Sequence, residues 1–208
     1  MKSTMGFLFS TLVGVVLSVS AFAASAQENP DELVRKSTTE VLAAPRADKE
    51  LAAGDPAKVE KLANEKILPY FNMPRMTQLA VGRSWRDATE AQKTALINEF
   101  RRLLVRTYSS SLSQFRNQTI DVRPLKLAAS DTEVVVKTVI NQPSGQPIPI
   151  DYSMEKSKDG WKVYDVLIDG VSLVTNYRSS FATEIKNTGI DGLIKSLADR
   201  NAKNAARK

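Results

Sequence analysis

The feature that most constrains this chain is residues 161–185, an apolar strand pattern followed by the start of an amphipathic helix. In its second part, Tyr177, Phe181 and Ile185 recur at helical spacing and form one stripe. In its first part, a period of two places apolar side chains on both faces of a strand: Trp161, Val163 and Leu167 on one, and Tyr164, Val166 and Ile168 mostly on the other. Because each apolar face needs an apolar partner, the stretch predicts either one wall of a cavity or a thick core. Periodicity alone favours the thick core.

The N-terminus predicts export. Lys2 supplies one positive charge, residues 7–19 are largely apolar, and Ala24-Ser25-Ala26 is a small-residue cleavage site. This pattern predicts a cleaved signal peptide over residues 1–26 and a periplasmic location. No later stretch approaches the roughly 18 apolar residues of a membrane-spanning helix, so we expect a soluble mature chain.

Composition narrows the chemistry. The chain has neither cysteine nor histidine, which excludes Ser-His-Asp and Cys-His catalysis and removes the commonest zinc ligand. Without the signal peptide, 28 basic and 23 acidic residues leave a net charge of +5. These charges are scattered along the chain, so we expect no nucleic-acid partner. We expect no metal or other cofactor, a single domain over residues 27–200 and a frayed tail over residues 201–208.

The order of the patterns predicts an α+β fold. Helical patterns come first, and Thr89 with Gln92 forms a capping box that opens a long central helix over residues 89–116. Alternating apolar runs between Gln118 and Ile168 predict an antiparallel meander, and helices follow it. We therefore expect a curved, mostly antiparallel sheet of about four to five strands wrapped by helices.

Candidate catalytic residues are few. Asp165 and Asp169 would lie roughly 13 Å apart on one strand, wider than a glycosidase pair, so turn capping or a salt bridge is the better interpretation. Ser172 follows Gly170 but has no histidine base. Two alternatives to a binding protein stay open. One is an isomerase- or hydrolase-like enzyme that uses Asp151 or Asp165 in a curved-sheet cavity, and the other is an envelope interaction module with a solid core.

A series of short motifs runs in order from about Leu33 to Leu197. The motifs are Gly82-Arg83-Ser84-Trp85-Arg86, Gln92, Glu99-Phe100-Arg101-Arg102-Leu103-Leu104, Tyr108, Val136-Lys137-Thr138, Pro149-Ile150-Asp151-Tyr152, Trp161-Lys162-Val163-Tyr164-Asp165-Val166, Gly170-Val171-Ser172-Leu173-Val174, Asn176-Tyr177-Arg178, Phe181 and Gly189-Ile190-Asp191-Gly192-Leu193-Ile194. This series resembles the signature of the MlaC, or toluene-tolerance, family of periplasmic phospholipid-binding proteins.

The resemblance implies a carrier and not an enzyme. Such a carrier buries the acyl chains of one phospholipid in a deep apolar cavity around which the sheet and helices wrap. It shuttles lipid between an outer-membrane lipoprotein complex and an inner-membrane ABC transporter with an MCE-domain ring, and so maintains outer-membrane lipid asymmetry. Bound phospholipid is then cargo, and we expect a monomer. Two tails of about 15 carbons represent roughly 20 kcal/mol of apolar exposure, so a shallow groove would leave most of it in water.

We expect the cavity wall to come from the long helix, the sheet and the segment after it. One face of the two-faced strand would pack on the core and the other on an acyl chain. The predicted lipid-contact residues are Leu104, Tyr108, Leu112, Phe115, Tyr152, Tyr164, Val166, Ile168, Val171, Leu173, Val174, Tyr177 and Phe181.

Overall fold

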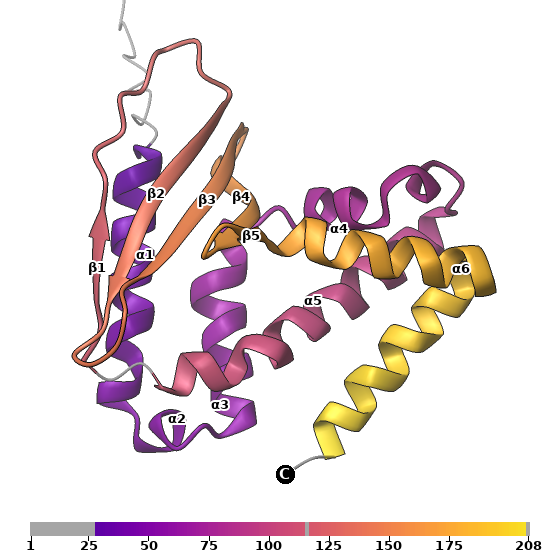
Figure 1. Cartoon of the computed structure of the whole chain (residues 1–208), viewed down its shortest axis with the longest axis horizontal. Coiled ribbons are helices and arrows are strands. Elements are labelled where there is room, and N and C mark those ends of the chain that lie inside the picture. The colour runs from indigo at the N-terminus through magenta and orange to yellow at the C-terminus, as the bar shows by residue number, and fades with distance from the viewer. Residues whose placement is uncertain (1–27, 115–116, 207–208) are drawn as a thin grey trace, which may run out of the picture.

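Five strands form an open antiparallel sheet in the order β1-β2-β3-β4-β5, with helices packed on it and beyond one edge (Figure 1). The computed structural model describes residues 28–114 and 117–206, with the side chains of residues 28–108 and 117–203. The strands are β1 (Thr119–Val122), β2 (Glu133–Asn141), β3 (Ile148–Ser157), β4 (Gly160–Ile168) and β5 (Val171–Ser172). The helices are α1 (Pro30–Ala47), α2 (Lys49–Ala52), α3 (Pro56–Leu62), α4 (Met73–Val81), α5 (Glu90–Gln114) and α6 (Leu173–Ala206), with a π-helix η1 (Ala63–Ile67) and two 3-10 helices, η2 (Leu68–Tyr70) and η3 (Gly82–Arg86). This arrangement confirms the predicted α+β fold class.

The long central helix α5 begins where the capping box predicts. The Thr89 backbone N–H donates to Gln92 Oε1 at 3.0 Å, and the Gln92 N–H donates to Thr89 Oγ1 at 3.2 Å. These reciprocal bonds satisfy two backbone donors at the start of the helix. The helix is described to Gln114, and residues 115–116 of the predicted span lie outside the described part of the chain.

A bulge between β3 and β4 changes the interpretation of the apolar strand. The pairing register shifts between Ser153 and Met154, which leaves Tyr164 as an extra residue on β4. Because a bulge resets the alternation of side chains, residues on either side of Tyr164 that were predicted to face oppositely share one face. Accordingly, one core cluster contains Trp161, Val163 and Val166, with Ile168 packed against it. The prediction that β4 presents two apolar faces was therefore wrong.

The helix α1 covers the apolar face of the sheet at β1 and β2 (Figure 1). Arg35 Nη2 donates to the Val122 carbonyl at 3.0 Å and ties the helix to the edge strand. The resulting cluster, here named the sheet core, comprises Leu33, Val34, Val122, Val136, Met154, Trp161, Val163 and Val166. The helix α1 thus covers part of this core, and Tyr70, Phe71 and Leu173 from other segments also pack against it.

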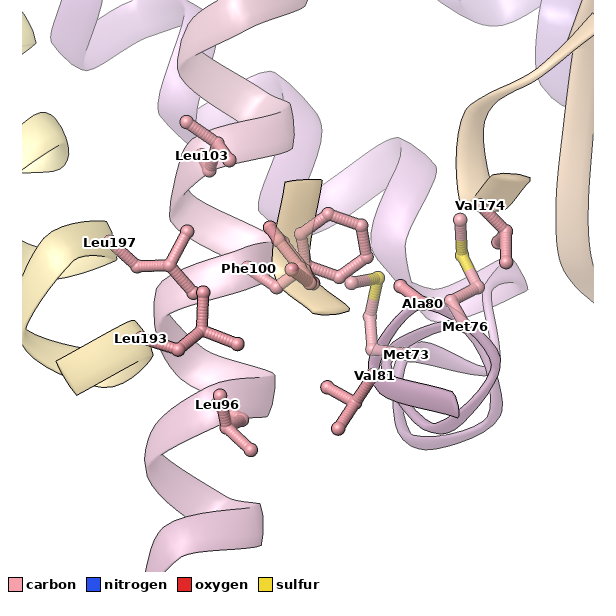
Figure 2. Close-up of a cluster of buried hydrophobic side chains, with 11 residues drawn as sticks. Met73, Met76, Ala80, Val81, Leu96, Phe100, Leu103, Val174, Leu193 and Leu197 are labelled. Carbon is pink, nitrogen blue, oxygen red and sulfur yellow. The ribbon is translucent and has the colours of Figure 1, made fainter. Parts of the chain in front are cut away.

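A second core lies beyond the β4–β5 edge, between α4, α5 and α6 (Figure 2). Its centre is Phe100 of α5, which is fully buried, as is Leu96. This helix core comprises Met73, Met76, Ala80, Val81, Leu96, Phe100, Leu103, Val174, Phe181, Leu193 and Leu197. The molecule therefore has two apolar cores, each built mostly from its own elements.

The helix α6 bends and then continues further than the sequence predicts. The bend is at Gly189, whose φ of 75° and ψ of −179° belong to a region open essentially to glycine alone. The sequence predicts fraying over residues 201–208, whereas α6 continues to Ala206. The reason is Asn201, which is 4% exposed and whose Nδ2 donates to the Glu99 carbonyl of α5 at 3.0 Å.

Among the described residues, no helix has the length and the apolar character needed to cross a membrane. The predicted signal peptide, residues 1–26, lies outside the described part of the chain. Export of this chain stays a prediction.

Candidate functional site

Half-buried apolar side chains border the two cores, and we name a group of them, centred on Phe71, the junction. Phe71, between η2 and α4, packs against both cores. The other members that pack on one core or the other are Leu68, Tyr70, Leu104, Ile150, Tyr152, Ile168, Leu173 and Tyr177. Because these side chains are apolar yet incompletely covered, the junction is suited to contact an apolar ligand.

On the sheet side, the register brings together several predicted contact residues. Tyr152 pairs with Val166 and Ile150 pairs with Ile168, so all four lie on the apolar face that carries the sheet core. Leu173, at the start of α6, packs against the same core. Burial raises the pKa of the Tyr152 phenol, although a hydrogen bond with Thr38 of α1 opposes the shift. The phenol is therefore neutral at ordinary pH and adds no charge to this face.

On the helix side, aromatic rings connect α5 with α6. The Phe100 ring lies edge-on to Tyr177 and Phe181, with centroid distances of 5.1 and 5.3 Å. Phe181 and Val174 are buried within the helix core, whereas Tyr177 and Leu104 are half-buried against it. Burial, and secondarily the nearby Tyr177, raises the pKa of Tyr108. The predicted residues on these helices thus include both core members and side chains at the core surface.

Tyr164 lies in a polar environment, away from the apolar face. The Arg75 guanidinium carbon lies 3.8 Å from the centroid of its ring, and its hydroxyl donates to Glu133 Oε2 at 3.3 Å. Arg75 also pairs with Glu133 at 2.7 Å and with Glu155, and Asn72 Nδ2 donates to Glu155 Oε1 at 2.6 Å. This Arg75 cluster ties the start of α4 to β2 and β3.

Three predicted lipid-contact residues remain. Val171 lies at the margin of the sheet, and the other two lie wholly or by their side chains outside the described part of the chain. Val171 follows the Asp169–Gly170 turn, in which both residues have positive φ, and it is 58% exposed. The side chain of Leu112 and all of Phe115 lie outside the described part of the chain.

Asp165 is a capping residue. Its carboxylate accepts from the backbone N–H groups of Val166 at 2.8 Å and Val174 at 3.1 Å, and from the Ser172 hydroxyl at 2.6 Å. Ser172 Oγ in turn accepts from the Thr175 N–H at 3.0 Å. The interpretation of Asp165 as a turn-capping group is confirmed, and Ser172 is part of the same cap at the start of α6.

The open groove among the described residues is lined mainly by polar side chains and does not coincide with the predicted lipid-contact residues. An open groove of about 460 Å³ follows the bend of α6 and is lined by Glu184, Thr188, Gly192, Lys195, Ser196, Asp199, Arg200 and Lys203. None of the predicted lipid-contact residues lines it. Across the described residues, no group of three or more carboxylates is arranged to hold a metal ion.

The junction contains residues that the sequence prediction of the cavity wall did not include. These are Leu68, Tyr70, Phe71 and Ile150. The density of aromatic side chains at Tyr70 and Phe71 is a usable signal, because two large rings beside a proline-bounded helix end rarely face water. Ile150 follows from the register alone, since it pairs with Ile168.

The family model described as "MlaC protein" matches residues 35–199, most of the chain. The chain belongs to the MlaC family. Its relatives include the toluene tolerance protein ttg2D of Pseudomonas putida, 26% identical over 178 residues, which are 85% of this chain and 82% of the relative. The intermembrane phospholipid transport system binding protein MlaC of Haemophilus influenzae is 24% identical over 177 residues, 84% of this chain and 83% of that one.

A solved structure with MlaC-like architecture has the same fold as this chain. It is described as a phospholipid-binding protein of Ralstonia solanacearum in complex with a phospholipid. The two chains are 40% identical and superpose with a TM-score of 0.81, over 86% of this chain and 99% of the other. The MlaC resemblance of the motifs is confirmed.

Proposed function

We propose that this protein binds a phospholipid and carries it between membranes through the periplasm. The observation that carries the proposal is the Ralstonia solanacearum structure, 40% identical, with the same fold and a bound phospholipid. Membership of the MlaC family indicates a lipid-binding carrier and not an enzyme. In this chain, the capping role of Asp165 agrees with that conclusion, because its carboxylate is occupied by hydrogen bonds.

We place the acyl chains at the junction of the two cores. Tyr152, Ile168 and Leu173 would contact them from the sheet side, and Leu104 and Tyr177 from the helix side. Tyr108, Leu112 and Phe115 would extend this wall along α5, and Val171 would lie at its rim. The buried Val166, Val174 and Phe181 would support the wall from behind. Tyr164 would act indirectly, by positioning α4 through Arg75.

The energetics favour an enclosed site. Each buried CH₂ is worth about 0.8 kcal/mol, so a lipid held at the surface would leave many kcal/mol of apolar exposure unrelieved. Transfer of the acyl chains from a bilayer to an apolar site changes their free energy little, because both environments surround the chains with apolar groups. We therefore infer that the partners, rather than affinity for the lipid, set the direction of transfer.

The finer proposal concerns location and partners. We propose that residues 1–26 are removed on export and that the mature protein is a periplasmic monomer. It would exchange lipid with an inner-membrane ABC transporter bearing an MCE-domain ring and with an outer-membrane lipoprotein complex, and so maintain the lipid asymmetry of the outer membrane. The name of the Haemophilus influenzae relative, an intermembrane phospholipid transport system binding protein, supports this role.

Mass spectrometry of solvent extracts tests the proposal. The protein is purified without detergent, together with Leu173→Asp and the control Leu127→Asp, which places the same charge on a residue 38% exposed in the loop after β1. We expect stoichiometric phospholipid in the wild type and the control, and its loss from Leu173→Asp. Ile168→Trp, which fills the site without adding charge, should also lower lipid occupancy while circular dichroism stays unchanged.

Each outcome has a clear meaning. A wild-type protein that yields a small polar ligand would support an enzyme, and one that yields nothing would support an interaction module. Full lipid occupancy in both Leu173→Asp and Ile168→Trp would remove these residues from the wall.

A further inference from the structure

Three arginines, two from η3 and one from α6, lie where these two distant parts of the sequence meet. The Arg178 guanidinium of α6 lies against Gly82, so closely that a Cβ on Gly82 would be 3.4 Å from Arg178 Nε and 3.8 Å from Nη2. Gly82 has a φ of +67°, a conformation that favours glycine, and it ends α4. These distances are ordinary van der Waals contacts, so the Arg178 guanidinium lies against this turn, and the positive φ rather than a lack of space favours glycine at position 82.

Arg83 and Arg86 lie beside this contact on η3. Residues three apart in a 3-10 helix lie on the same side, so Arg83 and Arg86 project from one side of η3, next to the Gly82 that Arg178 contacts. All three arginines are exposed. Among the residues that the structure describes, none of the three arginines is within ion-pair distance of a carboxylate. Glu90, which follows η3 in the sequence, pairs with Lys93 instead.

This group of cations has no role in the proposed lipid site. The junction is apolar, and the tie between the two cores uses a different arginine, Arg75. Three exposed like charges near one turn create a local positive potential, which attracts an anionic partner. Asp87, which follows Arg86, is one acidic neighbour in the sequence, and Glu90 pairs with Lys93, so an excess of positive charge remains.

We propose that Arg83, Arg86 and Arg178 form a docking surface for an acidic face of a protein partner. This inference rests on the proposed function and deepens it. It identifies the surface through which the carrier would bind the complex that gives or takes its lipid. A guanidinium group forms directional, paired hydrogen bonds with a carboxylate, and arginines held on a short turn suit carboxylates at fixed positions.

A protein partner fits this surface better than a membrane does. Surfaces that bind membranes generally combine basic residues with exposed apolar side chains that insert between lipids. The large apolar side chains that are exposed in the described part of the chain are Leu127, Val135 and Val171, none of which lies on η3 or on α6 near Arg178. Trp85 of η3 is half-buried, with the Lys93 ammonium 5.7 Å from its ring centroid.

The test measures binding of the lipid-loaded protein to the purified inner-membrane transporter complex and to the purified outer-membrane complex, by biolayer interferometry. The variant is Arg83→Glu/Arg86→Glu/Arg178→Glu, with a milder triple change to Gln in case the reversal disturbs folding. The matched control is Lys126→Glu/Lys156→Glu/Lys158→Glu, which makes the same change in net charge on exposed lysines of the sheet side. We expect at least tenfold weaker binding of the arginine variant to one complex and less than threefold weakening for the control.

Two further measurements make the outcomes distinct. Lipid extracts of each variant are analysed, and binding to phosphatidylglycerol vesicles is measured at the same salt. The docking proposal is overturned if both variants weaken binding equally, if neither does, if the wild type binds neither complex, or if the arginine variant loses only vesicle binding. Absence of phospholipid from the wild type would instead overturn the proposed function, and it would be seen without any partner.

Discussion

The helix core and the sheet core are each held together internally by apolar packing, whereas the contacts that tie one half to the other include an ion pair and hydrogen bonds. Within the helix core, Phe100 contacts both Tyr177 and Phe181 through edge-on rings. Between the halves, Arg75 pairs with Glu155, and the Asn72 N–H donates to the Val163 carbonyl at 2.8 Å. Hydrogen bonds and an ion pair thus join the two halves together with Phe71, which packs against both cores.

The largest expected effect comes from breaking the helix core. Phe100→Ala should lower the free energy of unfolding by roughly 3–5 kcal/mol, because it removes a fully buried ring and leaves a cavity. Urea denaturation measures the change. Phe100→Leu, the control, should cost much less, since it keeps most of the apolar volume. Similar losses for both variants would mean that the ring contacts, rather than the volume, hold this half together.

Removing the ion pair between the two halves should lower the free energy of unfolding by less than the loss of Phe100. Arg75→Gln should lower the free energy of unfolding by about 2 kcal/mol, because Glu155 is then left largely buried without its cation. The same urea titration measures it, and Arg86→Gln is the control, an exposed arginine without an ion pair among the described residues. A double-mutant cycle with Glu155→Gln should show coupling between the two positions. Purely additive effects would show that the ion pair does not join the halves.

The cap at the start of α6 sharpens the comparison, because it ties β4 to the helix that borders the junction. Asp165→Ala should lower the free energy of unfolding by about 1 kcal/mol, the usual cost of a lost helix cap. Ser172→Ala, which leaves the Asp165–Val174 bond in place, should cost less. A larger cost for Ser172→Ala than for Asp165→Ala would show that Ser172 rather than Asp165 provides most of the cap.

The smallest expected effect is a pH dependence of the Arg75 cluster. The hydrogen bond from Arg75 holds the pKa of Glu133 below its ordinary value of 4.5. A carboxylate with a lowered folded-state pKa stabilises the protein above its unfolded-state pKa, and this contribution is lost as the pH falls through the lowered value. Because Glu133 is half-exposed, solvent screening keeps the contribution below about 1 kcal/mol.

Urea midpoints at pH 7, 5 and 3 measure this dependence. The difference between the wild type and Glu133→Gln should shrink at pH 3, and it should be absent at every pH in an Arg75→Gln background. A constant difference would assign the effect of Glu133 to packing rather than to its charge.

Local patterns in the sequence determined the types of element and several of their boundaries. The capping box at Thr89 predicts the start of α5, because both its bonds form within four residues. The alternation of apolar residues predicts an antiparallel meander, and the wide spacing of Asp165 and Asp169 favours turn capping or a salt bridge over catalysis; the structure shows capping by Asp165. The ordered motifs predict the MlaC family, and residues 35–199 match it.

Only the tertiary structure decided which side chains share a face or a cluster. The extra residue at Tyr164 depends on how β4 pairs with β3, so the period of β4 by itself assigned Val166 to the wrong face. In the same way, Arg75 meets Glu155 and Arg178 meets Gly82 across about 80 and 96 positions of sequence, respectively. No local spacing encodes such contacts, because they arise from the packing of whole elements. Sequence periodicity reports the surroundings of a residue along its own helix or strand, whereas the partner across the fold is set when those elements come together.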